Sequence, residues 1–421
     1  MQPLFALFPP ASLFLNLYEL DFSAVLDLQG IVPNSQLSLL RQFLSPRLAF
    51  LSFHVPWGIL AQELNVFMDI LPSQTSGLRQ LVISSDKYGA SHRQIQLPLV
   101  KMQKLNTLGI IRNACLSKYS LADIAHLRFL HVLALNLGSD TVADSCSSDI
   151  TLELSLLECL TLDAASIQHC TSFLLRVCTP RLSCLSIKYN KLALSAEVKD
   201  FLLSLHTTCP ISESLEKLSV YRYVSVSDGD LDLHNPLPSH VFRPLLKFRR
   251  LTTVKMLAMG NYCLDDDFIK EVAAAWPDIH ELRFASEEMD ISSVTFSGVL
   301  SLATRCRSLR ILHLTFDATE MPTLPQGQGL WPKQTALQTL HVGNSKTQMT
   351  ALVPFVLAVV FPNLLDISYQ ITGTSDDIHW EQAAESFRKL LNHLEKHPGV
   401  AADFPGFVWG MLRADILESL S

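Results

Sequence analysis

Apolar residues recur along this chain in a fixed pattern, in which one apolar residue is followed by two spacers, a second apolar residue, one spacer and a third. The thirteen triplets of this kind begin at Leu17, Leu48, Leu78, Leu105, Leu130, Leu157, Leu182, Leu215, Leu251, Ile279, Leu309, Leu337 and Leu364. Their mean spacing of about 29 residues is at the long end of the leucine-rich-repeat range, in which each unit has a strand and a helix. Because the last two apolar positions are separated by one residue, their side chains point to the same side of an extended chain, and each triplet predicts a strand with one buried face.

Helices are predicted between the triplets. Asp265, Asp266 and Asp267 begin one of them, because acidic side chains in a first turn accept from free backbone amides and complement the helix dipole. It ends at Trp276 and Pro277, and another predicted helix runs from residue 296 to 306. Apolar residues three positions before a triplet are expected to fill the gap between helix and strand, and they are Met102, Leu127, Leu154, Phe248, Trp276, Cys306 and Phe361. Because Cys306 holds one of these positions, we predict that its role is structural.

The predicted fold is one α/β solenoid, shaped like a horseshoe, with about thirteen repeats, a parallel sheet on its concave face and helices on its convex face. We divide it into an N-terminal cap (1–16), the leucine-rich-repeat solenoid (17–375) and a C-terminal helical cap (376–421). Within that cap, residues 376–395 predict an amphipathic helix with one apolar face, made of Trp380, Ala383, Phe387, Leu390, Leu391 and Leu394. With the apolar cluster at 404–412, it is expected to cover the last repeat. Residues 225–238 predict an exposed loop.

The composition of the chain argues against some classes of function. Of the 421 residues, 48% are hydrophobic and 17% charged, which suits an array that buries a strand face and a helix face in every repeat. The net charge of −7 argues against nucleic-acid binding, which favours basic proteins. The most apolar run, residues 351–361, is too short to cross a bilayer, so we predict a buried helix and no membrane partner.

The nine cysteines include no CxxC pair, and the chain has no N-glycosylation sequon. The first basic residue is Arg41, so the N-terminus lacks the positive region of a signal peptide. These features predict an intracellular protein, either cytoplasmic or nuclear.

Motifs for catalysis, cofactors and metals are not found. The sequence has no GxSxG, HExxH, Walker-type loop or GxGxxG, so we predict no enzymatic activity and no cofactor. Asp228, Asp230 and Asp232 alternate as in an EF-hand, but Leu233 and Ser239 occupy the positions of its glycine and its last glutamate. The spacing of His169, Cys170, Cys178 and Cys184 is too irregular for a zinc finger, and core packing explains these residues better.

The residue between the second and third apolar positions of a triplet is expected to point outward from the sheet, on its concave side. In chain order these residues are Asp21, Ser52, Val82, Gly109, Ala134, Thr161, Ser186, Ser219, Lys255, Arg283, His313, His341 and Ser368. Since parallel strands lie about 4.8 Å apart, Lys255, Arg283, His313 and His341 would form a basic or protonatable row about 15 Å long. Arg310, at another outward position, would lie beside it.

We hypothesise that this row meets an acidic or phosphorylated protein partner, because like charges on adjacent strands are destabilising without one. The alternative is a solvated face whose charges are balanced by Glu281. In the N-terminal half, Val82, Gly109 and Ala134 would make a small apolar concave surface. That surface could receive a hydrophobic element or allow tighter curvature.

Several stretches resemble the F-box/leucine-rich-repeat proteins of mushroom-forming fungi. The residues that carry the resemblance are PLLKF at 244–248, LDDDFIKEVAAAWPDIHELRF at 264–284, FSGVLSLATRCRSLRILHLTFDA at 296–318, LQTLHVGNSK at 337–346 and FPNLLDI at 361–367. It is strongest over residues 240–370 and continues, more weakly, back to about residue 13. The order and spacing of these motifs carry it, rather than any one of them.

The resemblance implies recognition of substrate proteins for a Skp1–cullin ubiquitin ligase. Members of the family carry an N-terminal F-box that binds the Skp1 adaptor, whereas here the first triplet begins at Leu17 and too few residues precede it. We expect either that the module was lost or that the sequence is truncated. The alternative function is a stand-alone binder or inhibitor with no link to a ligase.

Overall fold

The computed structural model describes residues 14, 16–22, 36–55, 59, 61–85, 93–138, 151–207, 214–223, 235–286, 292–320, 331–348, 352–371 and 375–396. The chain divides into two compact units, which are described separately below. The first unit comprises Met1–Lys191 and Leu203–Leu215, and the second comprises Leu192–Leu202 and Glu216–Ser421. Helix α8 (Ser195–Thr207) contains residues of both units.

The first unit contains seven parallel strands that neighbour one another in chain order. They are β1 (Glu19–Phe22), β2 (Phe50–Val55), β3 (Gln80–Ser85), β5 (Thr107–Arg112), β7 (Val132–Leu137), β9 (Cys159–Ala164) and β11 (Cys184–Tyr189). Its helical segments are α3 (Gln36–Arg41), α4 (Ala61–Gln74), η1 (Leu99–Lys101), α5 (Lys118–Asp123), η2 (Ile124–His126) and α7 (Ile167–Leu174). Two short parallel pairs join β4 (Arg93–Ile95) to β6 (Ala114–Leu116) and β8 (Leu152–Glu153) to β10 (Val177–Cys178).

The second unit contains six parallel strands, also in chain order. They are β12 (Lys217–Arg222), β14 (Thr253–Leu257), β16 (Glu281–Ala285), β17 (Ile311–His313), β19 (Thr339–His341) and β21 (Asp366–Ser368). Its helical segments are α9 (Ser239–Phe242), η5 (Arg243–Lys247), α10 (Asp266–Ala275), α11 (Phe296–Arg305), α12 (Leu352–Val360) and α13 (Ser375–Lys396). Short pairs join β13 (Pro236–Pro238) to β15 (Asn261–Cys263) and β18 (Asp317–Ala318) to β20 (Lys346–Thr347).

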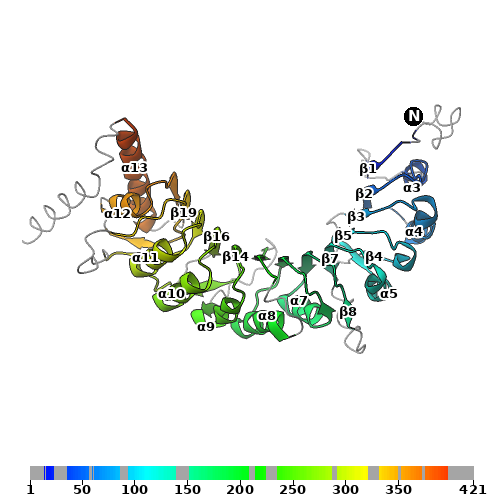
Figure 1. The fold of residues 1–421 in the computed structure, drawn as a ribbon, viewed down its shortest axis with the longest axis horizontal. Helices are drawn as coiled ribbons and strands as arrows, with labels where there is room; N and C mark the ends of the chain where they lie inside the picture. The colour runs from blue at the N-terminus through cyan, green and yellow to red at the C-terminus, as the bar shows by residue number, and fades with distance from the viewer. Residues whose placement is uncertain are drawn as a thin grey trace, which may run out of the picture. The chain divides into compact units, whose positions relative to one another are not determined.

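Each of the thirteen triplets lies on or directly beside one of these thirteen strands, so the prediction that they form neighbouring parallel strands is confirmed within each unit. In both units the helices lie along one side of the strands (Figure 1). The apolar residues of the triplets face the helices and form the core. Leu81, Leu185 and Leu282, for example, are fully buried, and each buried apolar side chain contributes about 1.5–3 kcal/mol. The fold is therefore an α/β fold built on a parallel sheet flanked by helices.

The position three residues before a triplet ends the preceding helical segment in several repeats, as predicted, whereas Leu154 follows strand β8 instead of a helix. Met102, Leu127, Phe248, Trp276 and Cys306 are buried C-cap residues of the preceding helical segments. Their carbonyls accept from the first residue of the next triplet, as in the bond from the Leu105 amide to Met102 at 3.1 Å. The polar Gln334 fills the same position before the triplet at Leu337. It is fully buried, and its side-chain amide bonds to backbone groups on both sides, including the Cys306 carbonyl at 3.1 Å.

The acidic start of α10 is also confirmed, and it stabilises two helices. The Asp265 carboxylate accepts from the Phe268 amide of its own helix at 2.8 Å. The neighbouring Asp266 accepts from the amides of Thr295 at 2.8 Å and Gly298 at 3.0 Å, and from the Thr295 hydroxyl at 2.7 Å. It therefore accepts from two amides at the start of α11. A side chain at Gly298 would place its Cβ 2.6 Å from this carboxylate, so glycine is required there.

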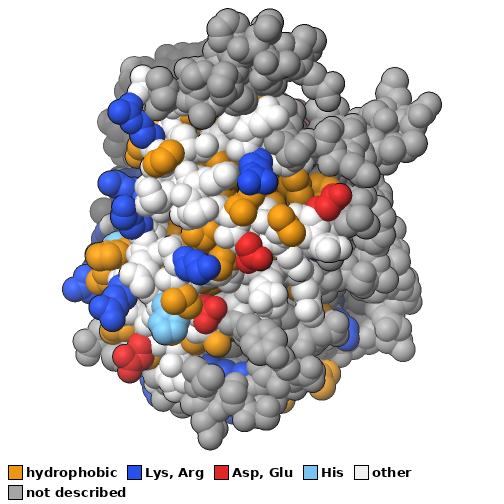
Figure 2. Space-filling model, turned by 90° about the vertical axis from the view of Figure 1, so that its right-hand side faces the viewer, with side chains coloured by type: hydrophobic (Ala, Val, Ile, Leu, Met, Phe, Trp, Pro, Cys, Tyr) orange, Lys and Arg blue, Asp and Glu red, His pale blue; other side chains and the backbone are white. Residues whose placement is uncertain are grey.

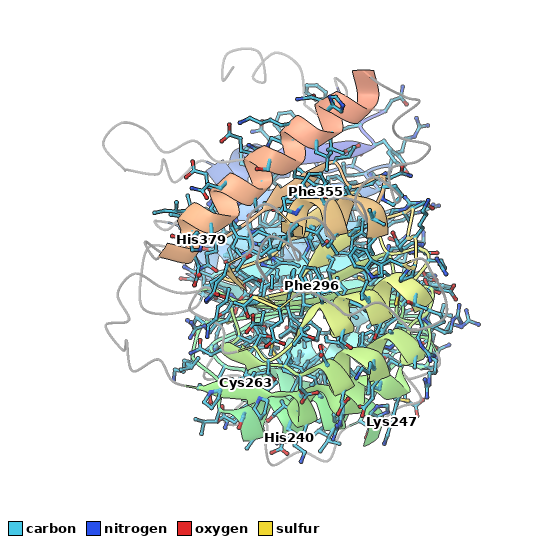
Figure 3. All side chains as sticks on the ribbon, turned by 90° about the vertical axis from the view of Figure 1, so that its left-hand side faces the viewer. His240, Lys247, Cys263, Phe296, Phe355 and His379 are labelled. Carbon is cyan, nitrogen blue, oxygen red and sulfur yellow. The ribbon has the colours of Figure 1, made fainter. Side chains whose placement is uncertain are left out.

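The predicted C-terminal helix is confirmed as α13, which lies across α12 in Figure 3. Three residues of this helix, Trp380, Ala383 and Phe387, are buried. The Trp380 Nε1–H donates to the Ser345 carbonyl at 2.6 Å. The His379 ring, labelled in Figure 3, lies with its Nδ1 2.9 Å from the Thr347 carbonyl. The predicted buried helix at 351–361 is also found, as α12.

The prediction of an exposed loop at residues 225–238 is wrong in part. Residues 236–238 form strand β13 and pair with β15, because prolines at both ends of a short edge strand do not disturb its pairing. The rest of that loop, with Asp228, Asp230 and Asp232, lies outside the described residues, as do the cluster at 404–412 and the side chain of Leu394. No helix in the described part of the chain combines the length and the apolar character needed to cross a bilayer.

Candidate functional site

The strands of each unit have a second face that carries no helices, here called the open face. On the open face of the second unit, the outward residues lie in register across six strands. The paired positions are Ser219, Lys255, Arg283, His313, His341 and Ser368. The four residues predicted to form a row are therefore neighbours. We call Lys255, Arg283, His313 and His341, together with Glu281, the polar row.

Glu281 joins the two cations of the polar row. It lies on the same strand as Arg283, two residues earlier, so both side chains point to the open face. One carboxylate oxygen is 2.9 Å from the Lys255 Nζ, and the other is 2.5 Å from the Arg283 Nε. The Glu281 side chain is only 15% exposed, whereas those of Lys255 and Arg283 are 33% and 35% exposed. The carboxylate is thus held between two cations that remain accessible to solvent.

The two histidines stack on each other. The ring centroids of His313 and His341 are 3.7 Å apart and their planes are inclined by 32°. The Gly343 amide donates to the His341 Nδ1 at 3.0 Å. Since a backbone amide can only donate, Nδ1 carries no proton and the neutral ring has its proton on Nε2. Gly343 has a φ of +59°, and a Cβ there would meet the Thr315 hydroxyl at 2.2 Å, so glycine is needed to place this amide.

Both imidazoles are uncharged at neutral pH. Burial, together with weaker repulsion from His341 and Arg283, lowers the pKa of His313 to about 3. The pKa of His341 is also lowered, first by burial and then by Arg283. The expectation of four basic or protonatable groups therefore needs correction. At neutral pH the polar row has two cations, one carboxylate and a neutral pair of rings.

Arg310 does not occupy an outward position of the sheet, contrary to the prediction. It precedes β17, whose outward residues are Ile311 and His313. Its amide donates to the His280 carbonyl at 2.8 Å, and its own carbonyl accepts from the Gln338 amide at 2.9 Å. Arg310 thus belongs to the turn that links successive repeats, and its side chain is exposed there.

Partly exposed apolar residues surround the polar row. Tyr221 and Leu257 are paired positions of β12 and β14, two residues beyond Ser219 and Lys255. On the other side, Ile311 of β17 pairs with Glu281. The open face of the second unit therefore combines accessible charge with apolar contact area, a combination that is common in protein interfaces.

The first unit presents a different open face. Its outward central residues are Asp21, Ser52, Val82, Gly109, Ala134, Thr161 and Ser186, which pair in register along the sheet. The predicted small surface of Val82, Gly109 and Ala134 is present, and a Cβ on Gly109 would come within 3.3 Å of the Val82 side chain. One polar contact crosses the strands here, between the His54 Nδ1 and the Ser84 hydroxyl at 3.0 Å. Figure 2, which faces the N-terminal end, shows basic side chains along one edge and dispersed hydrophobic ones.

The cysteines are arranged differently from the prediction. Cys170 is buried in α7, and burial raises the pKa of its thiol, so core packing explains this residue. Cys184, however, is a partly exposed outward residue of β11, and Cys178 is partly exposed on β10. Cys306 is fully buried, and burial raises the pKa of its thiol to about 12, which agrees with a structural role. Within the described residues, no cluster of three or more metal-ligating side chains is found.

Comparisons with known proteins do not assign the chain to a family. No protein-family model matches the chain, and no curated protein matches it either.

Proposed function

We propose that the strand–helix units of this chain are leucine-rich repeats, thirteen in number, and that the protein recognises other proteins through the open face of the second unit. The repeat assignment is supported by the triplet pattern, its spacing of about 29 residues and the parallel strands on which the triplets lie. In such a solenoid the open face is the concave binding surface.

The observation that carries the proposal is the bridge from Lys255 through Glu281 to Arg283. It holds two cations on adjacent strands in fixed positions while leaving about a third of each side chain exposed. Fixed donors lose little conformational entropy when they bind a partner, so preorganisation of this kind favours affinity. The stacked histidines continue the same rigid surface without adding charge.

The partner we propose is a protein segment with an acidic or phosphorylated side chain. Arg283 uses its Nε for Glu281, and a guanidinium has further N–H donors that can bind an anion in a forked geometry. A phosphate group carries about −1.5 to −2 charge, more than the Glu281 carboxylate, so it competes well for the same cations. Tyr221 and Leu257 would contact an apolar neighbour of that side chain.

The resemblance to F-box/leucine-rich-repeat proteins supports a more specific proposal, in which the segment belongs to a substrate of a Skp1–cullin ubiquitin ligase. The stand-alone binder is the alternative. Proximity labelling in the native cell separates the two. Labelled Skp1 and cullin would favour the ligase, and their absence among abundant labelled partners would favour the stand-alone binder.

The open-face contact is tested with the double variant Lys255→Gln/Arg283→Gln. On an array of acidic and phosphorylated peptides, we expect the wild-type chain to bind a subset and the variant to bind it at least about tenfold more weakly, since a hydrogen bond to a charged group contributes about 1.5–3 kcal/mol. The matched control is Arg250→Gln/Lys270→Gln, which removes two paired cations elsewhere in the same unit. Equal binding by wild type and the open-face variant would refute the proposed contact.

A further inference from the structure

Two cysteines lie opposite each other on the open face of the first unit. Cys159 begins β9 and Cys184 begins β11, and these strands are parallel neighbours in which the two residues form a register pair. Both residues are thiols and both are partly exposed. Since paired positions of parallel strands point to the same face, the two thiols project in the same direction.

The spacing of the strands brings these thiols within reach of a covalent bond. Paired residues on neighbouring parallel strands are about 4.8 Å apart, and a disulfide requires Cα atoms about 4.4–6.8 Å apart. The other cysteines of the described chain do not share this arrangement. Cys115, Cys170 and Cys306 are buried, and Cys178 and Cys263 pair across their short strands with Glu153 and Pro238.

Core packing does not account for this pair. The inward positions of the same strands are held by Leu160 and Leu162 and by Leu185 and Ile187, all of which are buried. Cys159 and Cys184 alternate with them and face outward. The sheet thus keeps two thiols side by side on a face where they add nothing to the hydrophobic core.

Small residues line one side of the pair, whereas Val132, which pairs with Cys159 on the preceding strand, is a larger exposed residue. The next outward residues along the two strands are Thr161 and Ser186, and Ala134 and Gly109 continue that row on the preceding strands. Small side chains of this kind leave room for a peptide-sized reagent to reach either sulfur. Access matters because thiol–disulfide exchange requires in-line attack on a sulfur atom.

We propose that Cys159 and Cys184 form a reversible dithiol site that is modified by a low-molecular-weight disulfide such as glutathione disulfide. The thiolate of one cysteine attacks the glutathione disulfide, forming a mixed disulfide and releasing one glutathione. The thiolate of the other cysteine then attacks the protein sulfur of the mixed disulfide, forming the Cys159–Cys184 bond and releasing the second glutathione. The protein loses two electrons and two protons, and the glutathione disulfide is reduced to two glutathiones.

The exposure of the pair explains why this bond would be reversible. Both cysteines are partly exposed, and exposed disulfides are more easily reduced than buried ones. Easily reduced disulfides are typically regulatory rather than structural. This inference does not rest on the proposed recognition function, because the two sites share no residue.

The test uses the full-length protein in glutathione buffers of increasing oxidised fraction. The remaining thiols are alkylated, and the protein is digested with trypsin and a glutamate-specific protease. Residues 182–188 then form a peptide with Cys184 as its single cysteine. Residues 159–176 form a peptide that carries Cys159 and Cys170, and fragmentation of the linked peptides in the mass spectrometer shows which of these two is joined to Cys184. We expect these two peptides to become linked as the oxidised fraction rises, and to separate again when dithiothreitol is added.

Two variants and a second reagent make the result decisive. Cys159→Ser should abolish the link and leave Cys184 as a mixed disulfide with glutathione, whereas the matched control Cys178→Ser should leave the link intact. Phenylarsine oxide, which binds paired thiols without oxidising them, should block alkylation of both cysteines in the wild type and should leave Cys184 open to alkylation in Cys159→Ser. Full alkylation of both cysteines under oxidising conditions, or a link from Cys184 to any other cysteine, would overturn the proposal.

Discussion

The two units of this chain use the same scaffold to present opposite kinds of surface. In both units, the apolar residues of the triplets face the helices, and the residues that alternate with them along each strand point to the open face. In the first unit, the central outward row holds small residues such as Gly109, Ala134 and Ser186. In the second unit, the corresponding row holds Lys255, Arg283 and two stacked histidines. The core therefore does not determine what the open face carries.

This difference shows where the sequence is constrained and where it can vary. Most triplet leucines are buried, and replacing one of these leaves a cavity that destabilises the fold. An outward residue touches mainly its neighbours in the same row, so a change there affects the surface more than the core. Four predictions test this separation, beginning with the largest expected effect.

Truncating a buried C-cap residue of a helix should destabilise the scaffold that both units share. Trp276 is fully buried, and its Nε1–H donates to the Phe248 carbonyl at 3.0 Å. We expect Trp276→Ala to lower the free energy of unfolding by about 3–5 kcal/mol, and Leu127→Ala, at the equivalent position of the first unit, by about 2–5 kcal/mol. Hydrogen exchange should show lost protection in β14 and β16 for the first variant and in β7 for the second. Unchanged protection would show that this position is not part of the scaffold.

Acid should destabilise the second unit through its neutral histidines. The pKa of His313 in the folded chain is about 3, below its ordinary value of 6.5, so at pH values between these the unfolded chain binds a proton that the folded chain does not. The stability that His313 contributes is therefore present above pH 6.5 and is lost as the pH falls toward 3. The slope is at most about 1.4 kcal/mol per pH unit, and partial exposure of the ring reduces it.

Denaturation midpoints between pH 7 and pH 4.5 measure this effect. We expect His313→Gln to show a shallower loss of stability with falling pH than the wild type. His126→Gln, which removes an exposed imidazole from the first unit, controls for the loss of a histidine. Equal slopes for wild type and His313→Gln would contradict the prediction.

In the second unit, the stability of the start of α11 should depend on the Asp266 carboxylate. Asp266→Ala removes three hydrogen bonds to the start of α11, and we expect a loss of about 1–2 kcal/mol in the free energy of unfolding. The matched control is Asp267→Ala in the same helical turn, where the side chain is 82% exposed, so the expected loss is below about 1 kcal/mol. Thermal denaturation distinguishes the two variants, and an equal effect would mean that the contact with α11 contributes little.

The smallest effect is expected on the open face of the first unit. Ala134→Lys places a charge beside Thr161 in the outward row, away from the core. We expect the free energy of unfolding to change by no more than about 0.5 kcal/mol, as for most surface substitutions. Chemical denaturation measures it. A loss of several kcal/mol would show that outward positions of this unit are part of its core, and the comparison between the two faces would fail.

The sequence predicted the strands well because their signal is local. A triplet such as Leu182, Leu185 and Ile187 places its residues on one face wherever it occurs, and all three are buried in the structure. The start of α10 was predicted for the same reason, since its cap depends on residues within one turn. The start of α11 also depends on Asp266 of the preceding repeat, which no local pattern shows. Strand β13 was missed because its prolines are typical of a loop.

The properties of the candidate site were predicted less completely, because they depend on contacts between repeats. The row itself follows from the register, but the neutrality of His313 follows from its burial against His341, about one repeat away. Arg310 was predicted to lie on the sheet, whereas the strand begins only at Ile311. Cys184 was assigned to the core, although Cys159 and Cys184 hold the same position in consecutive triplets and the register of the repeats pairs them.

The Asp266 contact has a consequence for how this chain can be shortened. Because α11 begins on a carboxylate supplied by α10, a fragment that starts after α10 would lack the acceptor for two amides and one hydroxyl at its first helix. A fragment that ends after α10 would keep the carboxylate but lose its donors. Truncations designed for expression should therefore keep residues 265–305 together, even though the triplet pattern suggests a convenient cut between them.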